Sequence, residues 1–161
     1  MDKTLLLREQ DLVKLNNISA NVDIDKLTPF IYMAQNNKIT RMLKNQLYNK
    51  ILTDFEDDKL SGDYLTLYND YVVDALIYYT TYFYWTVGLY QVDNQGAYKK
   101  SAENSEFLDP SELLRVGKFF EQQGQSVELN FEAWIKDKNI PEYNNGCSNN
   151  DNNSRGLNWQ L

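Results

Sequence analysis

The stretch VVDALIYYTTYFYWTVGLY, residues 72–90, decides how the rest of the chain must be arranged. Apart from Asp74 it carries no formal charge, and it belongs to a helical pattern that runs from Asp63 to about Val87. One face of this helix combines Leu65, Tyr68, Val72, Ala75, Leu76, Tyr79, Phe83 and Thr86. A second face is aromatic and combines Tyr64, Tyr71, Tyr78, Tyr82 and Trp85. A helix with two apolar faces is covered around most of its circumference.

The same stretch is about as long as a membrane span of about 20 residues, but its chemistry argues against one. Tyrosine and threonine fill its middle, whereas aromatic rings with polar tips favour the bilayer interface. One chain of 161 residues covers one face of a central helix more easily than two. We therefore expect the subunit interface to use the aromatic face, because tyrosine and tryptophan are enriched in interfaces. The residues concerned are Tyr71, Tyr78, Tyr82 and Trp85. The alternative is that the N-terminal arm folds over that face within one chain.

The composition narrows the possible functions. The chain holds 23 acidic against 16 basic residues, a net charge of -7, which disfavours binding to nucleic-acid phosphates or to anionic membranes. It has no histidine and a single cysteine, Cys147, so nucleophile pairs with histidine, histidine-bound zinc and an internal disulfide are excluded. The N-terminus does not have the pattern of a secretory signal.

We find no residue that stands out as catalytic. The acidic run DFEDDK at residues 54–59 fits no calcium loop, and no glycine-rich phosphate-binding motif occurs. The expectation is a protein that is not an enzyme, with no catalytic residue, no metal and no cofactor. A hydrolase that uses a pair of carboxylates is the lesser alternative, since any two acids can form such a pair.

The chain as a whole predicts an all-α, single-domain bundle of about four helices. An N-terminal arm spans residues 1–22, a helical domain residues 23–143, and an extended tail residues 144–161. Asp23 or Asp25 can cap the first helix, and apolar residues follow helical spacing from Ile24. Because of Pro29, its regular part is expected to begin near Thr28, with Pro29 in the first turn. A long loop near residues 90–108 has turn chemistry and room for a hairpin, and its basic spot Tyr98-Lys99-Lys100 is either a partner contact or solvated. The last helix begins at Pro110, with Gly124 as a possible bend, and ends at Pro141.

Residues 23–143 resemble the head–tail connector, or adaptor, proteins of tailed bacteriophages, especially those of the crAss-like phages of Bacteroidetes. The segments that carry the resemblance are Pro29-Phe30-Ile31, Ala34-Gln35, Ile39, Leu43, Leu47-Tyr48, Ser101-Ala102-Glu103-Asn104 and Pro141-Glu142-Tyr143. Relatives commonly place a glycine directly after the leucine at position 43, where this chain has Lys44. The absence of this glycine bears on how closely the helices pack at position 44, and not on the fold.

The resemblance implies a dodecameric ring beneath the portal that joins the capsid to the tail and lets DNA pass without specific binding. Its partners would be the portal protein, tail or further ring proteins, and other copies of itself, with no membrane. The protein would lie at the portal vertex of the virion, and in the host cytoplasm during assembly. The arm and the tail would bind neighbouring proteins through Leu5, Leu6, Leu7, Leu157, Trp159 and Leu161. The alternative class is a helical interaction or regulatory protein that is absent from the virion.

Overall fold

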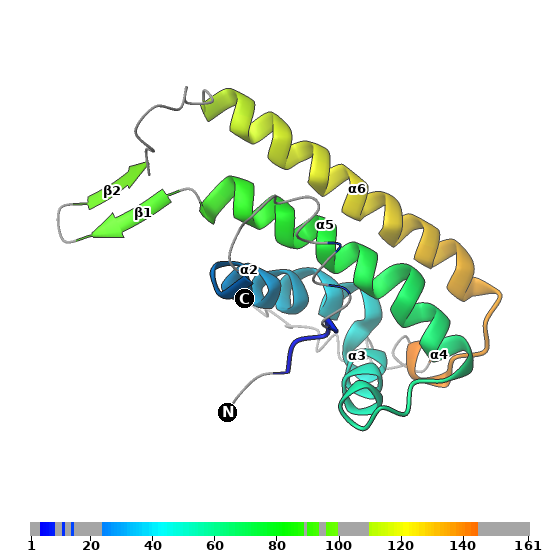
Figure 1. Cartoon of the computed structure of the whole chain (residues 1–161). Coiled ribbons are helices and arrows are strands. Elements are labelled where there is room, and N and C mark those ends of the chain that lie inside the picture. The colour runs from blue at the N-terminus through cyan, green and yellow to red at the C-terminus, as the bar shows by residue number, and fades with distance from the viewer. Residues whose placement is uncertain are drawn as a thin grey trace, which may run out of the picture.

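The structure, a computed structural model, describes residues 4–8, 11, 14, 24–88, 90–93, 96–99 and 110–144. Apart from one small hairpin, its elements are helical, which confirms the predicted all-α class (Figure 1). Three turns, labelled η, are wider π-helical turns that continue the α-helices beside them. In chain order the elements are α2 (Ile24–Ala34), η1 (Gln35–Ile39), α3 (Thr40–Glu56), α4 (Gly62–Leu67), η2 (Tyr68–Val72), α5 (Val73–Phe83), η3 (Tyr84–Gly88), β1 (Tyr90–Asp93), β2 (Gly96–Lys99), α6 (Pro110–Lys136) and α7 (Pro141–Asn144).

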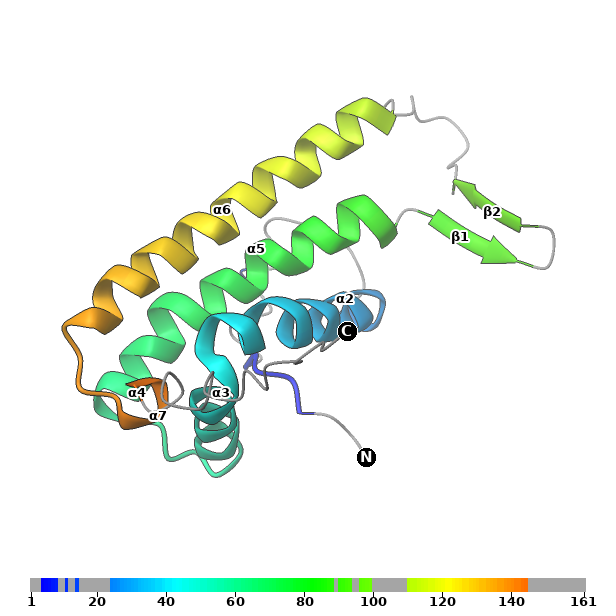
Figure 2. The ribbon, with the colours of Figure 1, turned by 180° about the vertical axis from the view of Figure 1, so that it is seen from behind.

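A single long helix forms the middle of the bundle. It combines α4, η2, α5 and η3 from Gly62 to Gly88, as the apolar pattern of that stretch predicts. We call it the central helix. Helix α6 lies along one side of it and α2 lies along the other, and the views from front and back agree on these layers (Figures 1 and 2). Within the described residues, no helix has the length and apolar character that crossing a membrane requires.

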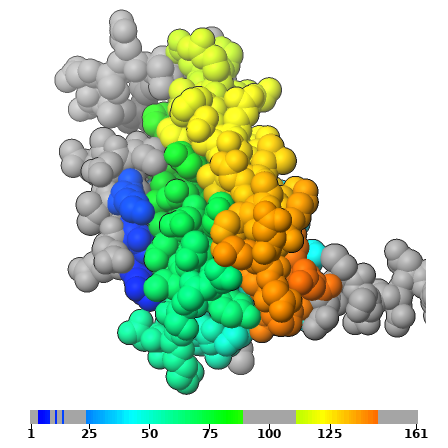
Figure 3. Space-filling view, turned by 90° about the vertical axis from the view of Figure 1, so that its right-hand side faces the viewer, coloured from blue at the N-terminus to red at the C-terminus, as the bar shows by residue number. Residues whose placement is uncertain are grey.

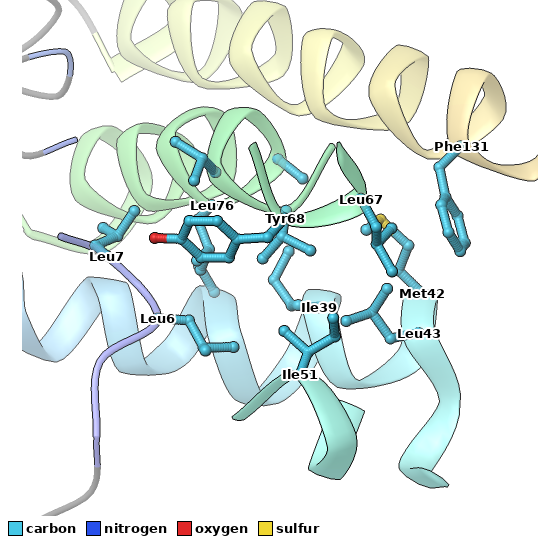
Figure 4. Close-up of a cluster of buried hydrophobic side chains, with 14 of the residues drawn as sticks. Leu6, Leu7, Ile39, Met42, Leu43, Ile51, Leu67, Tyr68, Leu76 and Phe131 are labelled. Carbon is cyan, nitrogen blue, oxygen red and sulfur yellow. The ribbon is translucent and has the colours of Figure 1, made fainter. Parts of the chain in front are cut away.

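The core lies where α2, η1, α3, the central helix and α6 meet. Figure 4 shows its side chains converging from all of these elements, with Tyr68 of the central helix in their midst. Its labelled members are Leu6, Leu7, Ile39, Met42, Leu43, Ile51, Leu67, Tyr68, Leu76 and Phe131. Full burial of one such side chain stabilises the fold by about 1.5–3 kcal/mol before entropy is counted. The N-terminal arm therefore contributes to the same core as the helices.

Two helix boundaries differ from the sequence predictions. Helix α2 begins at Ile24 and includes Pro29, so the predicted start near Thr28 is wrong. Pro29 lies inside the helix, beyond its first turn, so one backbone hydrogen bond is given up there. The Thr28 hydroxyl donates to the Ile24 carbonyl at 3.2 Å. Helix α6 ends at Lys136, and Pro141 begins α7 instead of ending α6. Proline suits the first position of a helix because its missing N–H needs no partner there.

Lys44 marks a sharp change of direction inside α3. Its backbone has φ 61° and ψ 161°, values that interrupt the helical run and that side chains other than glycine rarely adopt. Its Nζ lies 3.8 Å from the ring centroid of Tyr143 and donates to the Tyr143 carbonyl oxygen at 3.3 Å. Lys44 therefore holds α7 against α3. It is also the position at which the connector resemblance expects glycine.

Strands β1 and β2 form an antiparallel hairpin within the segment predicted as a long loop. Tyr90 pairs with Lys99, and Asp93 pairs with Gly96. The hairpin extends beyond the end of the central helix, on the side away from α3 (Figures 1 and 2). Residues 100–109 of the predicted loop lie outside the described residues.

Candidate functional site

The aromatic face of the central helix is partly covered by α6 of the same chain. The ring of Tyr71 lies 5.3 Å from the ring of Trp134 and 6.0 Å from the ring of Phe131, centroid to centroid. Tyr82 approaches α6 at Gly117, where an added Cβ would lie 3.7 Å from its ring. Two of the four residues expected at a subunit interface thus pack inside one chain.

The other two residues of that face are Tyr78 and Trp85, and both are half-buried. The ring of Trp85 packs edge-on against Tyr84, with centroids 6.3 Å apart. Its Nε1 is buried and has no hydrogen-bond acceptor among the described residues. A buried N–H without a partner costs free energy, so this end of the face is less well satisfied than the part beneath α6.

A polar network holds α6 onto the central helix and η1. The Tyr79 hydroxyl donates to Glu128 Oε1 at 2.7 Å, and Arg41 Nη2 lies 3.2 Å from the same oxygen. Lys38 Nζ lies 3.3 Å from Glu121 and 4.7 Å from the centroid of the Tyr79 ring. Burial, reinforced by the hydrogen bond to Glu128, raises the pKa of Tyr79. Because each carboxylate is engaged by a cation, we assign this network a structural role.

The N-terminal arm, residues 4–8 and 11, lies in a groove of the helical body. The side-chain amide of Gln35, buried in η1, accepts from the Leu6 backbone N–H at 2.9 Å and donates to the Thr4 carbonyl at 3.0 Å. The same amide nitrogen donates to the Tyr48 hydroxyl at 2.9 Å. Gln35 thus bonds two backbone groups of the arm, at Thr4 and at Leu6. We call this site the arm groove.

The far end of the arm is held by a second group of contacts. Asp11 is buried and accepts from the Tyr68 hydroxyl at 3.0 Å. Arg8 Nη2 lies 3.3 Å from Asp58, and its guanidinium carbon lies 5.5 Å from the centroid of the Tyr68 ring. Burial, with the neighbouring Asp11, raises the pKa of Tyr68. Asp11 and Arg8 therefore fix the arm from both sides of one aromatic ring.

These contacts show where the predicted arm residues lie. Leu6 and Leu7 fill the core of their own chain, and Leu5 is half-buried against it (Figure 4). In this conformation they bind the helical body instead of extending toward another protein. The predicted tail anchors Leu157, Trp159 and Leu161, together with Lys100, lie outside the described residues. Tyr98 and Lys99 belong to strand β2 of the projecting hairpin.

Sequence reasoning missed the outward face of α6. Three large apolar side chains are exposed there, Leu114 at 55%, Phe119 at 54% and Leu129 at 66%. Around the helix, Leu129 projects about 60° and Phe119 about 140° from Leu114, so the three side chains occupy a broad arc of the exposed surface. Figure 3 shows α6 running along the surface of the molecule. We call these three residues the α6 outer face. Their signal in the sequence is that they fall between the buried apolar positions of the same helix.

The described residues contain no cluster of histidine, cysteine and acidic side chains that could hold a metal ion. Among the comparisons with known proteins, residues 39–153 match a family described as a family of unknown function, DUF6712. The chain belongs to this family. The match includes α3, the central helix, the hairpin, α6 and α7, whereas the arm precedes it. No curated protein and no solved structure matches the chain.

Proposed function

We propose that this chain is a virion structural protein that forms a ring beneath the portal of a tailed phage. The ring would join the capsid to the tail and let DNA pass through its lumen. The observation that carries this proposal is the α6 outer face. Its three exposed apolar side chains lie on a helix whose opposite face already packs against the central helix.

A helix with apolar side chains on both its inner and outer faces is typical of a helix that packs on two sides. Among the residues that the structure describes, α6 is packed on one side, which leaves its second side for a neighbouring copy. Contacts between different surfaces of identical chains close into rings when the rotation permits. The α6 outer face would therefore contact a different surface of the next copy.

The charge of the chain supports the passage of DNA without specific binding. A net charge of -7 gives few sites that neutralise phosphates, so an acidic lumen would not hold the moving duplex. The resemblance supplies the partners, which are the portal protein on one side and tail or further ring proteins on the other. The protein would reside at the head–tail junction, and in the host cytoplasm before assembly. It would have no enzymatic activity and no cofactor.

One observation favours a second candidate function. The arm packs into the core of its own chain, and α6 covers part of the aromatic face. The chain therefore buries most of its apolar surface without a second copy. A self-contained helical protein fits an interaction or regulatory role outside the virion. Such a protein would use the α6 outer face to bind one host or phage protein.

Quantitative mass spectrometry of purified phage particles separates these two functions. The measurement compares the copy number of this chain with that of the portal protein. Equal copy numbers are expected for a ring that follows the portal symmetry. Absence of the chain from particles, with the chain present in infected cells, would overturn the connector function and favour the regulatory one.

A further inference from the structure

We propose that the arm groove receives the N-terminal arm of a second copy of this chain, so that neighbouring copies in the assembly exchange arms. The inference deepens the proposed function and rests on it only in requiring that copies assemble side by side. It assigns the groove a ligand of defined chemistry, an extended segment with two leucine anchors and an arginine.

The groove recognises the arm through features that any identical arm would satisfy. Gln35 binds backbone atoms of the arm, the N–H of Leu6 and the carbonyl of Thr4. Leu6 and Leu7 supply the apolar anchors, being 0% and 7% exposed. Backbone pairing provides affinity and the side-chain anchors provide the register, as when a peptide strand is added to a binding domain. The arm groove therefore makes the kinds of contact that a peptide-binding site makes.

The arm also carries its own local structure. The Arg8 N–H donates to Asp11 Oδ2 at 3.0 Å, and the Asp11 N–H donates to the Arg8 carbonyl at 2.9 Å. These two bonds close a turn inside the arm. Further contacts join the arm to Gln35 of η1, to Phe55 and Glu56 of α3, to Asp58 just after α3, and to Tyr68 of the central helix. Such contacts form equally well whether the arm belongs to the same copy or to a neighbour.

The connection between arm and body is long enough for exchange. Residues 15–23 join Lys14 of the arm to Ile24, the first residue of α2. A chain of this length spans up to roughly 33 Å when extended. Three layers of packed helices, each about 10 Å thick, measure about 30 Å, so the arm can reach across a body of α2, the central helix and α6 to an adjacent copy.

Exchange requires that copies lie side by side. The arm makes the same contacts in either arrangement, so the exchange itself costs little. What decides the balance is whether other surfaces already hold the copies together, and the α6 outer face is exposed for that role. Arm exchange would then link each copy to the next by a buried segment, in addition to surface contacts.

Chemical cross-linking between two full-length copies tests the proposal. One copy carries Thr4→Cys and the other Glu56→Cys, because these two side chains are hydrogen-bonded across the groove. Both copies carry Cys147→Ser and different affinity tags, and they are co-expressed and treated with a short bismaleimide. Arm exchange predicts a cross-linked product that contains both tags. A third chain that carries both cysteines shows the product formed within one copy.

A matched pair of cysteines controls for random collision. Lys138 and Asp63 form an ion pair of 3.0 Å inside the body, and neither belongs to a separable arm. Lys138→Cys on one copy and Asp63→Cys on the other should give no product with both tags. Adding Gln35→Ala to the Glu56→Cys copy should lower the yield of the arm product severalfold.

Two results would overturn the exchange. The first is cross-linking within one copy by the doubly substituted chain, with none between co-expressed copies whose two tags co-purify. The second is an equal yield from the control pair. Failure of exchange and failure of the connector function remain distinguishable, because the particle count is measured separately. A chain found in particles whose arms link only within one copy is a connector without arm exchange.

Discussion

At the scale of single residues, Lys44 shows how one backbone position can conflict with its side chain. Its φ of 61° and ψ of 161° turn α3 away from the direction of α2. For residues other than glycine, such a conformation costs about 1–3 kcal/mol. The contacts of its Nζ with Tyr143 offset part of this cost. Glycine, which the connector resemblance predicts at this position, would adopt the same backbone without strain.

Two substitutions separate the strain at Lys44 from its contacts. Lys44→Ala keeps the unfavourable backbone and loses the contacts with Tyr143, whereas Lys44→Gly loses the same contacts and relieves the backbone. The glycine variant is expected to be more stable than the alanine variant by about 1–2 kcal/mol. Urea unfolding followed by circular dichroism measures the difference. Equal stability would show that the backbone at this position is not strained.

Buried tyrosines make the fold sensitive to alkaline pH. Burial, with the hydrogen bond to Glu142, raises the pKa of Tyr64 from 10.0 to about 12. Burial also raises the pKa of Tyr68 and of Tyr79. Above pH 10.0 the unfolded chain releases these phenolic protons while the folded chain keeps them. The unfolded state then binds fewer protons, so the free energy of unfolding falls as the pH rises.

The expected result is a steady loss of stability between pH 10.0 and about pH 12, a window set by Tyr64. Tyr79→Phe should reduce the slope of this loss, because phenylalanine has no proton to release. Chemical unfolding at a series of pH values measures the slope. A free energy of unfolding that stays constant over this window would contradict the prediction.

At the scale of elements, the docking of α6 depends on two glycines. A Cβ on Gly124 would lie 2.7 Å from Tyr79 Cζ, and a Cβ on Gly117 would lie 2.6 Å from Thr86 Cγ2. Both distances are shorter than atoms in contact can adopt, so α6 approaches the central helix closely only because these side chains are absent. The sequence suggested a bend at Gly124, but α6 continues through this residue from Pro110 to Lys136. The role of this glycine is to let the Tyr79 ring approach the helix.

Gly124→Ala is therefore expected to destabilise the fold although alanine favours a helix by about 1 kcal/mol. The added methyl group must displace the Tyr79 ring, which gives a net loss of about 1–3 kcal/mol. The control is Gln125→Ala, at an exposed position on the same helix, which should change stability by less than about 0.5 kcal/mol. Thermal or urea unfolding measures both variants. A Gly124→Ala variant as stable as its control would show that α6 can shift freely.

At the scale of the whole molecule, the chain has a well-packed core and exposes large apolar side chains on α6. Its central helix is covered by α2 and α6, whereas the α6 outer face leaves Leu114, Phe119 and Leu129 exposed. The contact expected with a neighbouring copy therefore moves from the aromatic face of the central helix to the outer face of α6. All four residues of the original prediction, Tyr71, Tyr78, Tyr82 and Trp85, are half-buried.

A double substitution tests the α6 outer face without disturbing the core. Leu114→Lys with Leu129→Lys should leave the stability of the isolated chain within about 1 kcal/mol, since both side chains are exposed. The same variant should lose incorporation into phage particles, because lysines introduce charges into the contact. Complementation of a phage that lacks this gene, followed by a particle count, measures the loss.

The control for this experiment carries the same change of charge elsewhere. Gln46→Lys with Asn49→Lys adds two lysines at exposed positions of α3. This variant should be incorporated as the unmodified chain is. Normal incorporation of the α6 variant would show that its outer face contacts no neighbour.

The sequence by itself determined the local elements of this protein. The apolar period of residues 63–87 predicted the central helix, and Pro110 predicted the start of α6, because these signals depend on the spacing of neighbouring residues. Composition likewise predicted an all-α class. The start of α2 escaped prediction, since the tertiary packing of Leu27 and Ile31 outweighs the preference of Pro29 for a helix start.

Only the tertiary structure decided which surfaces of these elements are free. The aromatic face suggested a second subunit, but α6 covers Tyr71 and Tyr82, and the arm fills the core with Leu6 and Leu7. Gln35, which holds the arm, and Gly124, which lets Tyr79 approach α6, drew notice in the sequence for other reasons. Their roles come from partners many residues away along the chain. Periodicity reports which face of a helix is apolar, whereas the element that covers that face is chosen by long-range packing.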